Sequence, residues 1–221
     1  MSRGRAIRWE ERLLGFDLRV FSNEWPAERR AAYLLREVAQ PGSADSAVWP
    51  SIFDGTVQAR PAWVGPFQDL WEDLAALGQA VAALGETPRG ELVAVTVHAR
   101  ERAGLGSFLE AHRGYDPWTG ERVPLPYPLP ERCSERWALI GYDVCDVWGL
   151  SGLSNCAYDS GHAAELRAAW APRLNDRHLF VTLDDADAYR HVTDARVAEH
   201  APFWVFGLWA VTGDALGGEG T

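Results

Sequence analysis

The stretch WALIGYDVCDVWGLSGLSNCAY, residues 137–158, constrains the fold most strongly. Its first eight residues, Trp137–Val144, form an almost unbroken apolar run, which predicts a strand buried on both faces. A polar, glycine-rich loop follows, and loops at the ends of buried strands commonly carry function. We therefore expect a central strand at 137–144 and a candidate site directly after it.

Further elements are predicted on both sides of this stretch. Alternating or short apolar runs indicate four more strands, at 13–21, 92–98, 178–183 and 203–211. Apolar residues at helical spacing predict a clear helix over 67–84, and weaker signals indicate helices over 26–39, 101–112, 159–170 and 184–200. We expect an α+β fold, a mixed and mostly five-stranded sheet with helices packed on it. The alternative is a doubly wound α/β sandwich of three layers.

The size and composition of the chain indicate one domain. Its 221 residues are 47% hydrophobic, and no linker rich in Ser, Gly or Pro divides them. We predict a single domain over 1–212, followed by a flexible, glycine-rich tail over 213–221.

Charge and cysteine content limit the binding partners and the cellular location that we expect. A net charge of −10 disfavours binding to nucleic acid or to an anionic membrane surface. The longest apolar run, Phe203–Val211, is too short to span a bilayer. Three cysteines form no C-x-x-C pair, and no signal peptide is recognised. We expect free thiols and a cytoplasmic bacterial protein.

Candidate catalytic residues lie in and after the strand at 137–144: Asp143, Asp146, Cys156 and His162. Clustered carboxylates, with Asp159 close by, can divide acid and base roles or hold Mg²⁺. Cys156 is a candidate nucleophile with His162 as its base. The alternative is that the carboxylates cap loop amides and that the thiol is a small buried side chain. The histidines form no metal pattern, and we expect neither a metal nor a cofactor.

Candidate binding residues combine acidic and aromatic side chains. Acidic residues dominate the last third of the chain, and a proline-rich segment with an aromatic turn precedes the central strand. Charge steers association with a basic partner and aromatic side chains anchor it. The residues predicted to bind are Asp184, Asp185, Asp187, Trp118, Ser154 and Asn155. The alternative is that the acidic helix is only a solvated face.

The sequence thus supports two functions of different classes. The leading prediction is an interaction protein, of the kind that neutralises a toxin as an immunity protein, with a basic protein partner. The alternative is a hydrolase or transferase, assisted by a metal or a thiol, with its site in the loop after 137–144. Convergence of five side chains in one pocket would favour the enzyme: Asp143, Asp146, Asp159, Cys156 and His162.

Overall fold

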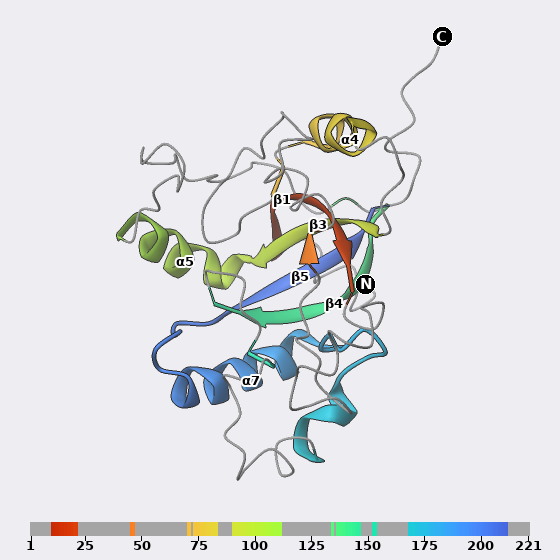
Figure 1. Ribbon diagram of the computed structural model, residues 1–221. Coiled ribbons are helices and arrows are strands. Elements are labelled where there is room, and N and C mark those ends of the chain that lie inside the picture. The colour runs from red at the N-terminus through yellow and green to blue at the C-terminus, as the bar shows by residue number, and fades with distance from the viewer. Residues whose placement is uncertain are drawn as a thin grey trace. The chain divides into compact units, whose positions relative to one another are not determined.

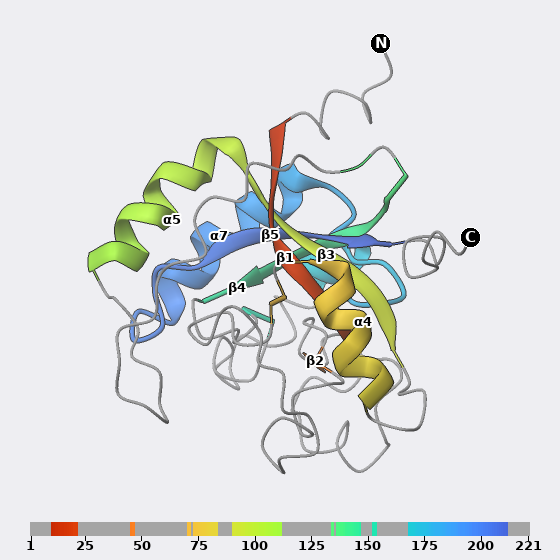
Figure 2. The ribbon, with the colours of Figure 1, turned by 90° about the horizontal axis from the view of Figure 1, so that it is seen from above.

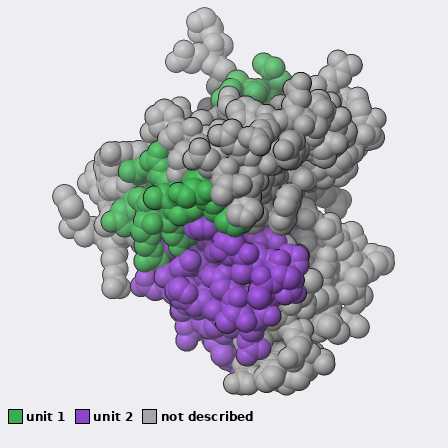
Figure 3. Space-filling model, turned by 90° about the vertical axis from the view of Figure 1, so that its left-hand side faces the viewer, with its two compact units in different colours: residues 1–19, 46–139, 207–221 green, residues 20–45, 140–206 purple. Residues whose placement is uncertain are grey.

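The computed structural model describes residues 10–21, 45–46, 70–71, 73–83, 90–111, 134, 136–146, 152–153 and 168–211. The chain divides into two compact units, coloured separately in Figure 3. Unit 1 comprises residues 1–19, 46–139 and 207–221, and unit 2 comprises residues 20–45 and 140–206. Each unit draws on stretches that lie far apart in the sequence, and the single domain over 1–212 stays a prediction. The tail at 213–221 lies outside the described residues.

The strands confirm the α+β class. They are β1 (Glu11–Val20), β2 (Asp45–Ser46), β3 (Glu91–His98), β4 (Ala138–Cys145) and β5 (Trp204–Ala210), in the order β2-β1-β3-β5-β4. β1 and β3 are antiparallel, with Glu11 opposite His98. Four strands are long, whereas β2 has two residues, so a sheet of five full strands is not confirmed. The strand predicted at 178–183 forms only isolated bridges, at Phe180.

β4 lies at the end of this strand order, so its predicted central position is wrong. Within unit 2 its backbone has another partner, because Tyr142 and Phe180 exchange N–H···O=C bonds of 2.9 and 2.8 Å. The side-chain amide of Asn175 also donates to the carbonyl of Ile140, at 2.8 Å. These bonds satisfy groups that a bare edge strand would expose to solvent. An edge strand covered in this way is buried over 141–145 and has the composition of an interior strand.

Unit 1 is built around β1, β3 and the helix α4 (Leu74–Ala83) (Figures 1 and 2). Leu77 and Ala80 of α4 belong to one buried cluster with Phe16 of β1. The helix predicted from residue 67 begins later, because Trp71 forms a backbone bridge with Phe16 instead. Gly15 permits this approach, since a Cβ there would lie 2.8 Å from the Cβ of Leu70. The second helix of this unit, α5 (Ala99–Ala111), follows β3 directly and confirms the prediction at 101–112.

Unit 2 contains the short 3-10 helix η3 (Ala171–Arg173) and the helix α7 (Leu183–Arg196). Thr182 caps α7 by accepting a hydrogen bond of 3.1 Å from the N–H of Asp185. Tyr189 packs its ring against Trp170 and Phe180, with centroid distances of 5.0 and 5.2 Å. The helix predicted over 184–200 is confirmed up to Arg196 and ends there. Among the described helices, none is long and apolar enough to cross a membrane.

Candidate functional site

A buried carboxylate meets a partly exposed imidazole at the end of β4, within unit 2. Asp146 follows β4, and its side chain is fully buried. Its Oδ2 lies 3.0 Å from Nδ1 of His200, whose side chain is 33% exposed. A carboxylate beside Nδ1 favours the tautomer with the proton on that nitrogen, so Nε2 is the basic one. The pair has the geometry of an oriented acid–base group.

Regular structure fixes both members of this pair. Asp146 is held by the strand before it, and Tyr189 on α7 donates a hydrogen bond of 2.9 Å to the carbonyl of Gly152, in the chain beyond β4. His200 stands in the turn that ends α7, where its N–H donates to the carbonyl of Val197 at 2.9 Å. An imidazole on a hydrogen-bonded turn is better placed for chemistry than one on a free loop.

Of the candidate catalytic residues, the structure describes Asp143 and Asp146. Asp143 is buried within β4, where its Oδ1 accepts a hydrogen bond of 2.8 Å from the N–H of Val144. Asp146 meets His200, a residue not predicted for the site. Cys156 and His162 lie outside the described residues, so their convergence with the aspartates stays a prediction. Cys145 is buried, as expected for a side chain in this strand.

The acidic residues predicted to bind a partner are partly neutralised within unit 2. Asp185 forms an ion pair of 2.8 Å with Arg173, and Asp187 one of 2.7 Å with Arg190. Asp184 is exposed. The three other predicted binding residues, Trp118, Ser154 and Asn155, lie outside the described residues. Two of the three helix carboxylates therefore have a structural role in addition to any role in binding.

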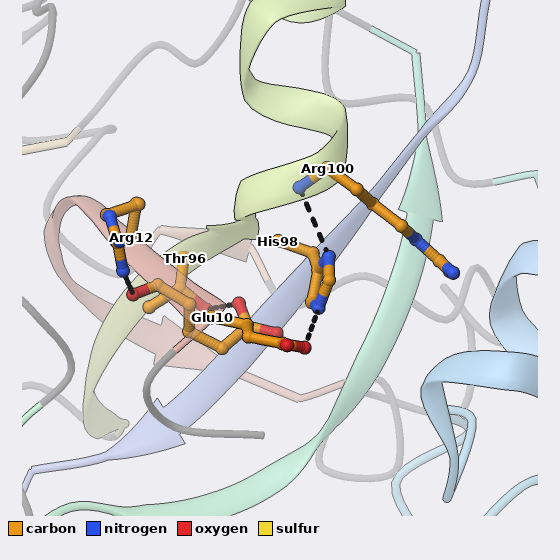
Figure 4. Close-up of polar contacts among 6 residues, drawn as sticks. Glu10, Arg12, Thr96, His98 and Arg100 are labelled. Atoms are coloured by element: carbon orange, nitrogen blue, oxygen red, sulfur yellow. Dashed lines mark hydrogen bonds and ion pairs between the residues drawn. The ribbon is translucent and has the colours of Figure 1, made fainter. Parts of the chain in front are cut away.

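A second group of titratable side chains lies at the end of the β1–β3 ladder, in unit 1 (Figure 4). Nε2 of His98 is 2.8 Å from Oε2 of Glu10, and the N–H of Arg100 donates to Nδ1 at 3.3 Å. Glu10 and Arg100 approach the imidazole ring from opposite edges (Figure 4). Both ring nitrogens are thus engaged. The His98 side chain is only 8% exposed, whereas that of Glu10 is 61% exposed.

Glu11 is fully buried beside this pair. Its Oε2 accepts a hydrogen bond of 2.6 Å from the hydroxyl of Thr96. Burial raises the pKa of the Glu11 carboxyl above its ordinary value of 4.5, and the charges of Glu101 and Glu10 add to this rise. The Thr96 hydrogen bond and the charge of His98 act in the opposite direction. Burial is the largest of these causes, so the pKa of Glu11 is raised overall.

Sequence reasoning missed His200, His98 and Glu11. The two-residue alternation in the sequence begins at residue 13, whereas β1 begins at Glu11 and its register shifts between Leu13 and Gly15. Because of this shift, Glu11 does not follow the two-residue period of the rest of the strand. The carboxylate partner of His200 is 54 residues away in the sequence. No local signal links the two.

No set of three or more His, Cys, Asp or Glu side chains in the described part of the chain is arranged to hold a metal ion. No family model, curated protein or solved structure matches the sequence. The geometry of these side chains is therefore the basis on which we infer a function.

Proposed function

We propose that the chain is an acid–base enzyme of the hydrolase or transferase class, with His200 as its general base and Asp146 as the residue that orients it. The observation that carries this proposal is the 3.0 Å contact between a fully buried carboxylate and an imidazole that is one-third exposed. The buried member supplies orientation and charge, and the exposed member can reach a substrate. Asp146 directly follows β4.

The chemistry follows from the tautomer. Nε2 of His200 takes a proton from water or from a substrate hydroxyl as that oxygen attacks an electrophilic carbon or phosphorus. The Asp146 carboxylate stabilises the imidazolium that forms, and the imidazolium then returns the proton to the leaving group. With water as the nucleophile, the proton that His200 takes is the proton that the leaving group receives, so the proton balance closes within this pair.

The test compares two histidines of the same unit. We expect His200→Gln to lower kcat/KM by about 10²- to 10⁴-fold on whichever ester or phosphoester of a chromogenic panel the protein cleaves. Asp146→Asn should also lower kcat/KM, because the amide no longer selects the tautomer. His191→Gln, at an exposed position on α7, is the matched control and should leave the rate unchanged.

Diethyl pyrocarbonate gives a readout that needs no substrate, because it acylates accessible neutral imidazole nitrogens. His200 should react faster than His98, and Asp146→Asn should change its rate. Full activity in folded His200→Gln, or no turnover on any substrate class by a protein whose His200 reacts fast, would contradict the catalytic proposal.

The second candidate function is interaction with a basic protein partner, as an immunity protein does. One observation favours it: Val181 is 56% exposed, the only large hydrophobic side chain so exposed among the described residues. It lies just before α7, whose first turn carries Asp184 and Asp185. An exposed apolar side chain beside negative charge suits a partner with a basic rim around an apolar pocket.

Binding to a basic toxin encoded beside this protein would test that candidate. We expect Asp184→Asn to slow association and flatten its salt dependence, because this carboxylate is exposed. Val181→Ser should speed dissociation instead, since an apolar anchor acts mainly on the off-rate. Unchanged rates in both variants would remove the support for this function.

A further inference from the structure

One carboxyl oxygen of Glu11, Oε2, is closely surrounded by neighbouring groups. Oε2 accepts from the Thr96 hydroxyl at 2.6 Å, and that hydroxyl accepts in turn from the indole N–H of Trp209 at 2.9 Å. Gly207 of β5 leaves space for these two hydrogen bonds, because a Cβ there would lie 2.5 Å from Oγ1 of Thr96 and 3.4 Å from Oε2 of Glu11. This oxygen is therefore fixed by three strands of unit 1.

The other carboxyl oxygen, Oε1, has a different environment from Oε2. Oε1 of Glu11 is buried and has no hydrogen-bond partner among the described residues. The titratable groups whose charges act on Glu11 come from each neighbouring element: Glu10 just before β1, His98 at the end of β3 and Glu101 in the first turn of α5. Two of these three are carboxylates. An ionised Glu11 would hold a buried charge with one unsatisfied oxygen, whereas the protonated acid carries no charge.

His98 is the neighbour of Glu11 across the β1–β3 ladder, and its side chain is only 8% exposed. Glu11 is opposite His98 in the β1–β3 register, and the ring of His98 contacts the exposed Glu10 (Figure 4). A change of charge at Glu11 therefore acts where the two strands are held together at this end. The far end of the same ladder, where Arg19 is opposite Glu91, is remote from the group in sequence and register.

We propose that Glu11 is a pH-sensitive switch, which holds the first residues of β1 against β3 while protonated and releases them when it ionises. The raised pKa of the buried carboxyl is consistent with this role. For a group whose pKa is higher in the folded than in the unfolded state, the stabilisation is complete below pH 4.5 and is lost as the pH rises through the folded pKa. The first residues of β1 should therefore be released from β3 as the pH rises through the folded pKa of Glu11.

Amide hydrogen exchange of the full chain, corrected for intrinsic rates, tests the switch. As the pH rises from 4.5 through the folded pKa of Glu11, protection at the start of β1 and the end of β3 should fall, by up to tenfold per pH unit, since one proton is released. Protection near Leu18 and Leu92, at the other end of the ladder, should stay constant. In Glu11→Gln the fall should be absent, and in Glu10→Gln, which changes the exposed neighbour, it should persist.

Two results would overturn the proposal. One is a pH dependence in Glu11→Gln equal to that of the unaltered protein. The other is equal loss of protection at both ends of the ladder. If Glu11→Gln does not fold, the carboxyl ¹³C resonance of Glu11 can be titrated in the unaltered protein and in Thr96→Val. Ionisation should move to higher pH in Thr96→Val, which removes the donor, and ionisation at or below pH 4.5 in the unaltered protein excludes the switch.

Discussion

The two units each pair a carboxylate with an imidazole, but they bury opposite members of the pair. In unit 1 the imidazole of His98 is 8% exposed and its partner Glu10 is 61% exposed. In unit 2 the carboxylate of Asp146 is fully buried and His200 is 33% exposed. Contacts at both nitrogens engage His98, whereas the described contact of His200 is at Nδ1. The buried member thus determines which pair presents a basic nitrogen to a substrate.

The largest expected effect follows from this inversion. Asp146→Ala removes a buried charged acceptor and should lower the free energy of unfolding by about 2–3 kcal/mol, because the imidazole of His200 loses its charged hydrogen-bond partner. Glu10→Ala removes the exposed member of the other pair and should cost about 0.5 kcal/mol or less. Urea unfolding at pH 7 measures both. Equal losses in the two variants would mean that burial does not distinguish the pairs.

Two buried threonine hydroxyls allow a sharper comparison. Thr96→Val deprives the indole N–H of Trp209 of its acceptor and should cost about 1–2 kcal/mol. Thr193→Val removes a bond of 3.2 Å from the hydroxyl to the carbonyl of Tyr189, four residues earlier in α7. That carbonyl lies within a helix, so the cost should be below about 1 kcal/mol. Urea unfolding of both variants and the unaltered protein at one fixed pH gives both values. A larger loss in free energy of unfolding for Thr193→Val than for Thr96→Val would show that unit 2 depends more on its buried threonine hydroxyl than unit 1 does.

Much of the fold was predictable because apolar periodicity depends on local sequence. The strands β1, β3, β4 and β5 and the helices α5 and α7 all follow patterns of this kind. The order of the strands did not follow, because it is set by pairings between distant segments. β4 shows the reason: contacts with Phe180 and Asn175 bury an edge strand, which then has the composition of a central one.

The candidate site was predictable only in part. Asp146 was identified because a polar loop begins where a buried strand ends. Its partner His200 was not, since the turn after α7 brings it there from 54 residues away. The acidic residues of α7 were visible in the sequence, but their pairing with Arg173 and Arg190 was not predicted.

The smallest expected effect concerns a third imidazole, that of His178. It compares how the stability of each unit depends on pH. Burial lowers the pKa of His178 below its ordinary value of 6.5, and the charge of Asp176 offsets part of this. For a lowered pKa, the stabilisation is present above pH 6.5 and is lost as the pH falls through the folded pKa. Glu11 has the opposite sign. Unit 2 should therefore lose stability towards acid at this residue, and unit 1 towards alkali.

His178→Asn tests this contrast, since asparagine does not titrate and is among the residues that tolerate the φ of 59° found here. The loss in free energy of unfolding between pH 7.5 and pH 5 should be smaller in this variant than in the unaltered protein. His191→Asn, at an exposed position, should keep the original loss. Urea titrations at both pH values supply the comparison. If the free energy of unfolding of His178→Asn falls between pH 7.5 and pH 5 as much as that of the unaltered protein, burial at this turn does not control the charge of the imidazole. The predicted opposite pH responses of the two units would then not hold for unit 2.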